Sequence, residues 1–83
     1  MTHQYRIEYA DAARAALRAM PSAARSAFEA GMKKVAADPY GPGTGPANSP
    51  REPDRRSATV GSYIAVYYVS RPVLTITTVH IIG

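Results

Sequence analysis

Residues 38–54, DPYGPGTGPANSPREPD, contain five prolines and three glycines, and this density constrains the fold more than any other feature. Proline lacks the amide hydrogen that regular structure uses, and glycine weakens helices and strands, so we expect no regular element here. At this length a loop usually carries a function or is disordered. The residues after the loop cannot form a domain alone, so we expect a single domain over 1–83.

The residues before the loop predict one strand and two helices. Residues 4–9, QYRIEY, alternate polar and apolar side chains, as in a half-buried strand. The alanine-rich residues 12–20 predict a helix whose first turn the Asp11 carboxylate would cap. Pro21 ends that helix and suits the first turn of the next one, which we expect over 22–37. The two helices would form a hairpin.

Three strands are predicted after the loop, over 55–60, 63–69 and 73–82. These residues are rich in β-branched and tyrosine side chains, and the short connections at 61–62 and 70–72 fit tight turns. Two successive hairpins give an antiparallel meander. Because the apolar sides of the helices need a partner, we expect an α+β fold of order β-α-α-β-β-β, with the helical hairpin on one face of a small antiparallel sheet.

Composition excludes several classes of protein. The chain has no cysteine, and its two histidines, His3 and His80, are far apart, so we expect no disulfide, metal site or cofactor. It has no apolar run long enough to span a membrane and no apolar segment typical of a signal peptide, which predicts a cytoplasmic protein. A net charge of +4 favours an anionic partner, either nucleic acid or an acidic protein.

Three stretches of the sequence resemble the RelE/ParE superfamily of bacterial type II toxins. ADPYGPG, residues 37–43, ends the second helix and starts the proline-rich loop. VGSYIAVYYV, residues 60–69, is similar to the family's core strand VGDYRVIYEV, and LTITTVH, residues 74–80, is similar to its last strand, which commonly ends in VGHRR. The short helical hairpin favours the RelE side. The resemblance implies a curved sheet on two helices, and either an mRNA endonuclease that acts at the ribosome or a gyrase inhibitor.

The resemblance also implies metal-free RNA cleavage, in which a 2′-hydroxyl attacks the adjacent phosphate. This reaction needs a base, an acid and cations that stabilise the extra phosphate charge. Ile64 and Ile81 both stand where the family usually has an arginine, and the chain stops at Gly83. We therefore expect an atypical active site, or a member of the same fold that does not cleave RNA, such as a gyrase inhibitor or an antitoxin-binding module.

Four residues are candidates for catalysis, namely Arg56, His80, Tyr68 and Glu52. Glu52 lies in REP, which is similar to a PEP stretch whose glutamate is a base in one nuclease subgroup. His80 suits acid–base work near neutral pH, and strand alternation predicts that it shares the core-side face with Thr78. Tyr68 would face outward to stack on a base or contact an antitoxin, whereas Tyr67 would pack in the core. Each of the other three has a structural alternative. Arg56 could form a solvated charge pair at the start of a strand, Glu52 could form a loop salt bridge, and His80 could be a structural histidine.

Four further cations are candidates for RNA binding, namely Arg51, Arg55, Lys33 and Lys34. Any one of them could equally be a solvated surface charge. Together with the other basic residues of the helices they fit electrostatic attraction to ribosomal RNA or to an acidic antitoxin. The expected partners are a cognate antitoxin, the ribosome and mRNA, with no membrane contact. Unpaired sheet edges would also allow a homodimer.

Overall fold

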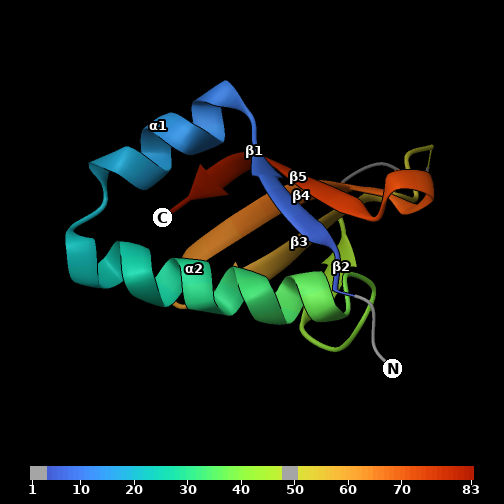
Figure 1. Cartoon of the computed structure of the whole chain (residues 1–83), viewed down its shortest axis with the longest axis horizontal. Helices are drawn as coiled ribbons and strands as arrows, with labels where there is room; N and C mark the ends of the chain where they lie inside the picture. Colours follow the sequence, from blue (N-terminus) through green and yellow to red (C-terminus); the bar gives the residue numbers. More distant parts are fainter. Residues whose placement is uncertain (1–3, 48–50) are drawn as a thin grey trace.

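The computed structural model describes residues 4–47 and 51–83, and shows two helices on one side of a five-stranded sheet (Figure 1). This confirms the predicted α+β class and the order of the predicted elements. The elements are β1 Arg6–Tyr9, α1 Asp11–Ala19, α2 Ser22–Ala37, β2 Thr44–Pro46, β3 Arg55–Val60, β4 Tyr63–Ser70, the 3₁₀ turn η1 Arg71–Val73, and β5 Thr75–Ile82.

The strand order is β1-β5-β4-β3-β2, and the sheet is mixed. Strands β2, β3, β4 and β5 pair with one another in antiparallel order, as the meander predicts for the last three. The expectation of a wholly antiparallel sheet is wrong, because β1 pairs with β5 in parallel. The antiparallel prediction rests on strands joined by tight turns. β1 is followed by the two helices and is not joined to β5 by a tight turn, so a parallel pairing is possible.

A short strand forms inside the proline-rich loop, which corrects the prediction of no regular structure there. β2 pairs Thr44 to Pro46 with residues 56–58 of β3. The Ala47 amide donates to the Arg55 carbonyl, so by alternation the nitrogen of Pro46 points away from β3. Proline is tolerated on an edge strand in that orientation, because no ladder hydrogen bond is lost.

Several predicted boundaries also shift, among them the start of β1, which is Arg6 and not residue 4. Asp11 is the first residue of α1 and not its cap; the cap is Ala10, which has no side-chain hydrogen bond. The carboxylate of Asp11 still lies in the first turn, where the helix dipole favours it. The last strand starts at Thr75 and not at residue 73, because Arg71–Val73 form the 3₁₀ turn and Leu74 is left-handed with φ 46°.

The core lies between the helices and the sheet. α2 contributes Phe28 and Met32, and the sheet contributes Tyr67 and Ile76, all almost fully buried. The prediction that Tyr67 packs in the core is therefore confirmed. At Gly31 a Cβ would collide with the side chain of Val60, so glycine permits the close approach of α2 to β3.

Arg25 joins the two helices. Its guanidinium donates hydrogen bonds from α2 to the carbonyls of Leu17, Arg18 and Met20 at the end of α1, at 3.2–3.3 Å. The Leu17 carbonyl also accepts from the Met20 amide. The last carbonyls of a helix generally have no partner within it, so Arg25 supplies donors to the end of α1 that water would otherwise supply.

We therefore predict that Arg25→Ala lowers the free energy of unfolding by about 1–2 kcal/mol, because it removes several hydrogen bonds from a charged donor. Chemical denaturation followed by circular dichroism measures the change. Arg18→Ala is the matched control, since this exposed arginine is on the same hairpin, and it should change stability by no more than about 0.5 kcal/mol. Equal effects of the two changes would contradict the role given to Arg25.

Candidate functional site

The face of the sheet opposite the helices is open, and its residues follow from the strand register. On β4 the residues Ile64, Val66 and Tyr68 share this face, as predicted, while Ala65 and Tyr67 point to the core. Paired residues on neighbouring strands point to the same side. The open face therefore carries three rows across β3, β4 and β5, which are Arg55–Tyr68–Thr77, Ser57–Val66–His80 and Thr59–Ile64–Ile82.

A β-bulge in β5 decides where His80 lies. Tyr67 pairs with Thr78 but Val66 pairs with His80, so one extra residue, Val79, is inserted in β5. The bulge interrupts the alternation, and the prediction that His80 shares a face with Thr78 is wrong. Thr78 is buried on the core side, whereas His80 is exposed on the open face, one row from Tyr68.

Three of the predicted polar residues meet at one end of this face. The Tyr68 hydroxyl lies 3.4 and 3.5 Å from the two carboxylate oxygens of Glu52. The guanidinium of Arg55 lies 5.9 Å from the centroid of the Tyr68 ring. With His80 in the next row, these residues form what we call the open-face cluster: Glu52, Arg55, Tyr68 and His80.

Arg55 is held in this cluster but has unused hydrogen-bonding capacity. Its Nη1 donates to the Ala47 carbonyl at 3.1 Å. Its Nε is buried, and within residues 4–47 and 51–83 it has no hydrogen-bond partner. An unsatisfied buried donor costs free energy, so the position of this nitrogen is unfavourable for stability.

Arg56, a candidate for catalysis together with Tyr68 and His80, lies on the opposite side of the sheet. It pairs with the buried Tyr67, and its Nε donates to the Pro39 carbonyl at 3.2 Å. Its Nη2 donates to the Thr44 hydroxyl at 2.9 Å. The Tyr67 hydroxyl donates to the same Pro39 carbonyl at 2.7 Å. Arg56 thus ties the start of the proline-rich loop to the core face.

A second cationic cluster surrounds Tyr40 in this loop. The guanidinium groups of Arg56 and Arg71 lie 5.0 and 4.7 Å from the centroid of its ring. The Tyr40 hydroxyl donates to Asp54, and the Nε of Arg71 donates to that hydroxyl at 3.4 Å. A cavity of 720 Å³ opens beside it, with Pro53, Asp54, Arg71 and Val73 among its lining residues. Sequence reasoning missed this cluster, although an aromatic residue between prolines was a visible signal.

Burial raises the pKa of the Tyr40 phenol, and the hydrogen bond to Asp54 raises it further. The contact with Tyr40 raises the pKa of Arg71. Burial is also the largest cause of the raised pKa of Tyr67. Both phenols therefore stay protonated at neutral pH and act as hydrogen-bond donors.

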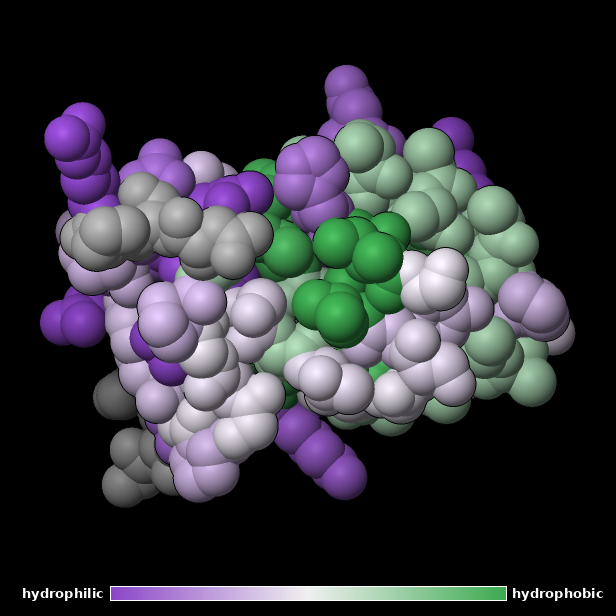
Figure 2. Space-filling model, turned by 180° about the vertical axis from the view of Figure 1, so that it is seen from behind, coloured by the Kyte–Doolittle hydropathy of each residue, from purple (hydrophilic) through white to green (hydrophobic). Residues whose placement is uncertain are grey.

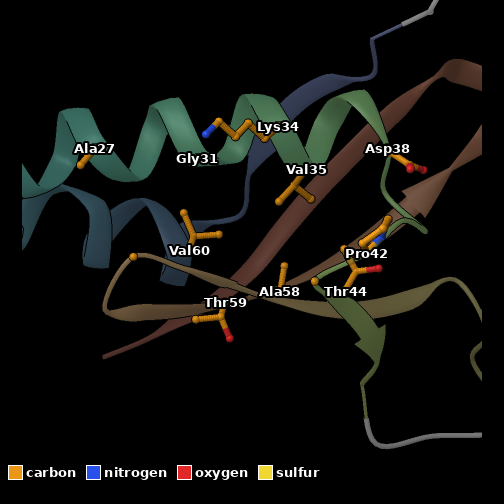
Figure 3. A pocket seen from close by; sticks show the side chains of 12 residues that line it. Ala27, Gly31, Lys34, Val35, Asp38, Pro42, Thr44, Ala58, Thr59 and Val60 are labelled. Carbon is orange, nitrogen blue, oxygen red and sulfur yellow. The ribbon is translucent and has the colours of Figure 1, made fainter.

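The remaining candidate cations do not join the open-face cluster as a group. Lys33 and Lys34 are exposed on α2, in the layer on the other side of the sheet. Lys34 lines a cavity of 480 Å³ between α2 and β3, into which Val35, Ala58 and Val60 project (Figure 3). Arg51 is exposed and adjacent in sequence to Glu52.

The other end of the open face is apolar. Ile64 and Ile82 pair across β4 and β5 and are 44% and 58% exposed. Figure 2 shows hydrophobic side chains gathered in the middle of the side turned away from the viewer in Figure 1, with hydrophilic ones near them. Ile81, expected to share a site with Ile64, pairs with Ala65 and packs against the core. The expectation that Ile64 and Ile81 lie on one site is therefore wrong, because the bulge moves Ile81 to the core-side face. The residue that pairs with Ile64 on the open face is Ile82.

No group of three or more His, Cys, Asp or Glu side chains that could hold a metal ion occurs within the described ranges. In the same part of the chain no helix is both long and apolar enough to cross a membrane.

The fold of this chain is similar to that of RelE toxins of known structure. No family model and no curated protein matches the sequence. Among solved structures, the chain is similar to the Mycobacterium tuberculosis toxin–antitoxin complex RelBE2, with TM-score 0.80 and 18% identity over 98% of this chain and 99% of that one. It is similar to the archaeal RelE–RelB complex of Pyrococcus horikoshii, with TM-score 0.76 and 21% identity over 100% and 96%. It also resembles the isolated RelE toxin of Escherichia coli, with TM-score 0.77 and 17% identity over 95% and 83%.

We predict that Arg56→Ala lowers the free energy of unfolding by about 1–3 kcal/mol, because the change removes two hydrogen bonds from a charged donor. Limited proteolysis should also cut faster within 38–47, since the loop loses its attachment to β3. Thr59→Ala, at an exposed position of the same strand, is the control and should stay within about 0.5 kcal/mol of the parent chain. An Arg56→Ala variant as stable and as resistant as the parent would remove the structural role given to Arg56.

Proposed function

We propose that this chain is the toxin of a type II toxin–antitoxin system and that it cleaves mRNA at the ribosome with an atypical active site. The observation that carries the proposal is the open-face cluster on a sheet of RelE fold. A carboxylate, a phenol, an imidazole and a guanidinium converge there on one solvent-accessible surface. Such a protein would act in the cytoplasm and would be neutralised by a cognate antitoxin.

The residues of the cluster match the needs of metal-free RNA cleavage. The 2′-oxygen would form a bond to phosphorus while the bond from phosphorus to the 5′-oxygen breaks. Glu52 is the candidate base that takes the 2′ proton, and His80 is the candidate acid that gives a proton to the 5′-oxygen. Arg55 would donate to the phosphate oxygens, in the role that the sequence suggested for Arg56.

Tyr68 lies between these groups and would position the RNA. Its ring can stack on a base and its hydroxyl can donate to phosphate. Arg51 would extend the contact along the RNA backbone. Lys33 and Lys34 are too far around the molecule to touch the same nucleotide, so we assign them to attraction toward ribosomal RNA or an acidic antitoxin.

A second candidate function is a member of the same fold that binds without cleaving, such as a gyrase inhibitor. The exposed Ile64 and Ile82 favour it, because apolar side chains on an open sheet suit a protein partner better than a phosphate. The two candidates are separated by assaying the purified chain on mRNA with and without ribosomes, and on gyrase-catalysed DNA supercoiling. mRNA cleavage supports the first; blocked supercoiling without cleavage supports the second.

We predict that Arg55→Ala and His80→Gln each reduce the rate of mRNA cleavage by about 10²-fold, because each removes either charge stabilisation or proton transfer. The measurement is single-turnover cleavage on programmed ribosomes. Thr59→Ala is the control, since it changes the open face at the row farthest from Tyr68 and should leave the rate unchanged. Full activity in both cluster variants would disprove the assignment of these residues.

We further predict that Ile64→Arg increases cleavage, by about tenfold, because it adds a phosphate-binding group on the face of the cluster. Ile64 is substantially exposed, so the arginine side chain needs no new space in the core. Ile64→Lys is the matched comparison, since lysine adds the charge without the planar pair of donors and should help less. A decrease in cleavage with an unchanged unfolding temperature would argue against a cationic role for this position.

A further inference from the structure

β1 is an end strand of the sheet, and one of its edges is open. Its ladder with β5 uses the amides of Arg6 and Ala10, which donate to Leu74 and Thr78 at 2.7 and 2.9 Å. Successive peptide groups of a strand point to opposite edges, so the amide and carbonyl of Ile7 point away from β5. No strand of the described part of the chain pairs with β1 on that side.

The other end strand is closed to pairing by its own sequence. In β2 the amide of Thr44 donates to the Gly41 carbonyl, and Pro46 has no amide hydrogen. An added strand would find no free donor there. Of the two end strands, β1 is therefore the one that can accept another strand.

The extent of the open edge is limited by α2. The Tyr5 amide donates to the Ala36 carbonyl at 2.9 Å, and the Gln4 side chain donates to the Lys33 carbonyl at 3.1 Å. At the other end the Tyr9 carbonyl accepts from Arg14 at 3.2 Å. The free segment is thus centred on Ile7, with Arg6 and Glu8 on either side.

The sequence Arg6-Ile7-Glu8 is complementary to itself when reversed. In an antiparallel pair of two copies with Ile7 on the two-fold axis, each Ile7 exchanges both of its backbone hydrogen bonds with the other. Arg6 then stands opposite Glu8 of the second copy, at the close spacing of a pair that exchanges no hydrogen bonds. Within one chain these two side chains already lie on one face, 3.7 Å apart and exposed, so they are available for this exchange.

We propose that the β1 edge is a self-association surface, at which two copies of this chain join their sheets through antiparallel β1 strands in the register Arg6–Glu8, Ile7–Ile7, Glu8–Arg6. The partner is a second copy because the charge pattern matches its own reverse. The Ile7 side chains, half-buried on the core side, meet at the axis. The paired segment is short, so the dimer is weak and concentration-dependent.

A charge exchange at these two positions tests the proposal. The full chain is measured by sedimentation equilibrium up to about 1 mM, a range suited to a small contact. Arg6→Glu alone places acids opposite acids, and Glu8→Arg alone places bases opposite bases, so each should weaken the dimer by about tenfold or more. The double variant Arg6→Glu/Glu8→Arg restores both pairs and should dimerise like the parent chain.

Mixing the two single variants gives the sharpest result. Acids of one chain then face bases of the other in both positions, so the mixture should form heterodimers although neither component forms homodimers. A parent chain that stays monomeric, single variants that dimerise like the parent, or a double variant that remains monomeric would each overturn the proposal. The experiment is independent of RNA cleavage, since none of these residues belongs to the open-face cluster.

Discussion

The carbonyl of Pro39 is the point on which the arrangement of this small protein depends. It accepts one hydrogen bond from the buried Tyr67 hydroxyl in the middle of the sheet and another from the Arg56 side chain. Both donors belong to the core face, so the beginning of the proline-rich loop is fixed against the sheet as α2 ends. From there the loop can turn back to add β2, and the return places Glu52 beside Tyr68 on the other face. A polar contact within the core thereby organises a polar site outside it.

The sequence predicts the class of fold well because its elements are locally consistent. The alanine-rich helices and the β-branched strands each agree with the structure they form. What it does not predict comes from pairing between distant residues. The parallel contact of β1 with β5 and the strand at Thr44–Pro46 both depend on an edge that only the folded sheet provides. Nothing in the local pattern of either segment carries that information.

The candidate site was predictable to the extent that strand alternation holds. Alternation places Tyr67 inside and Tyr68 outside correctly along β4, which is regular. It fails along β5, where Val79 is inserted and His80 and Ile81 exchange faces. Arg55 and Arg56 show the same limit, since adjacent residues of a strand necessarily point to opposite sides and only one of them can reach the open face. Arg55 and Arg56 are neighbours in the sequence, yet their side chains lie on opposite faces of the sheet.

The inserted residue in β5 has a consequence for how this protein is compared with others. Before Val79, each residue of β5 lies on the face of the sheet that regular alternation predicts for it. After Val79, each residue of β5 lies on the face opposite to the one that regular alternation predicts. Ile82, and not Ile81, is the residue that shares a surface with Ile64. At the end of this chain, the layer that a side chain enters decides which residues share a surface, and counting along a regular alternation gives the wrong residue.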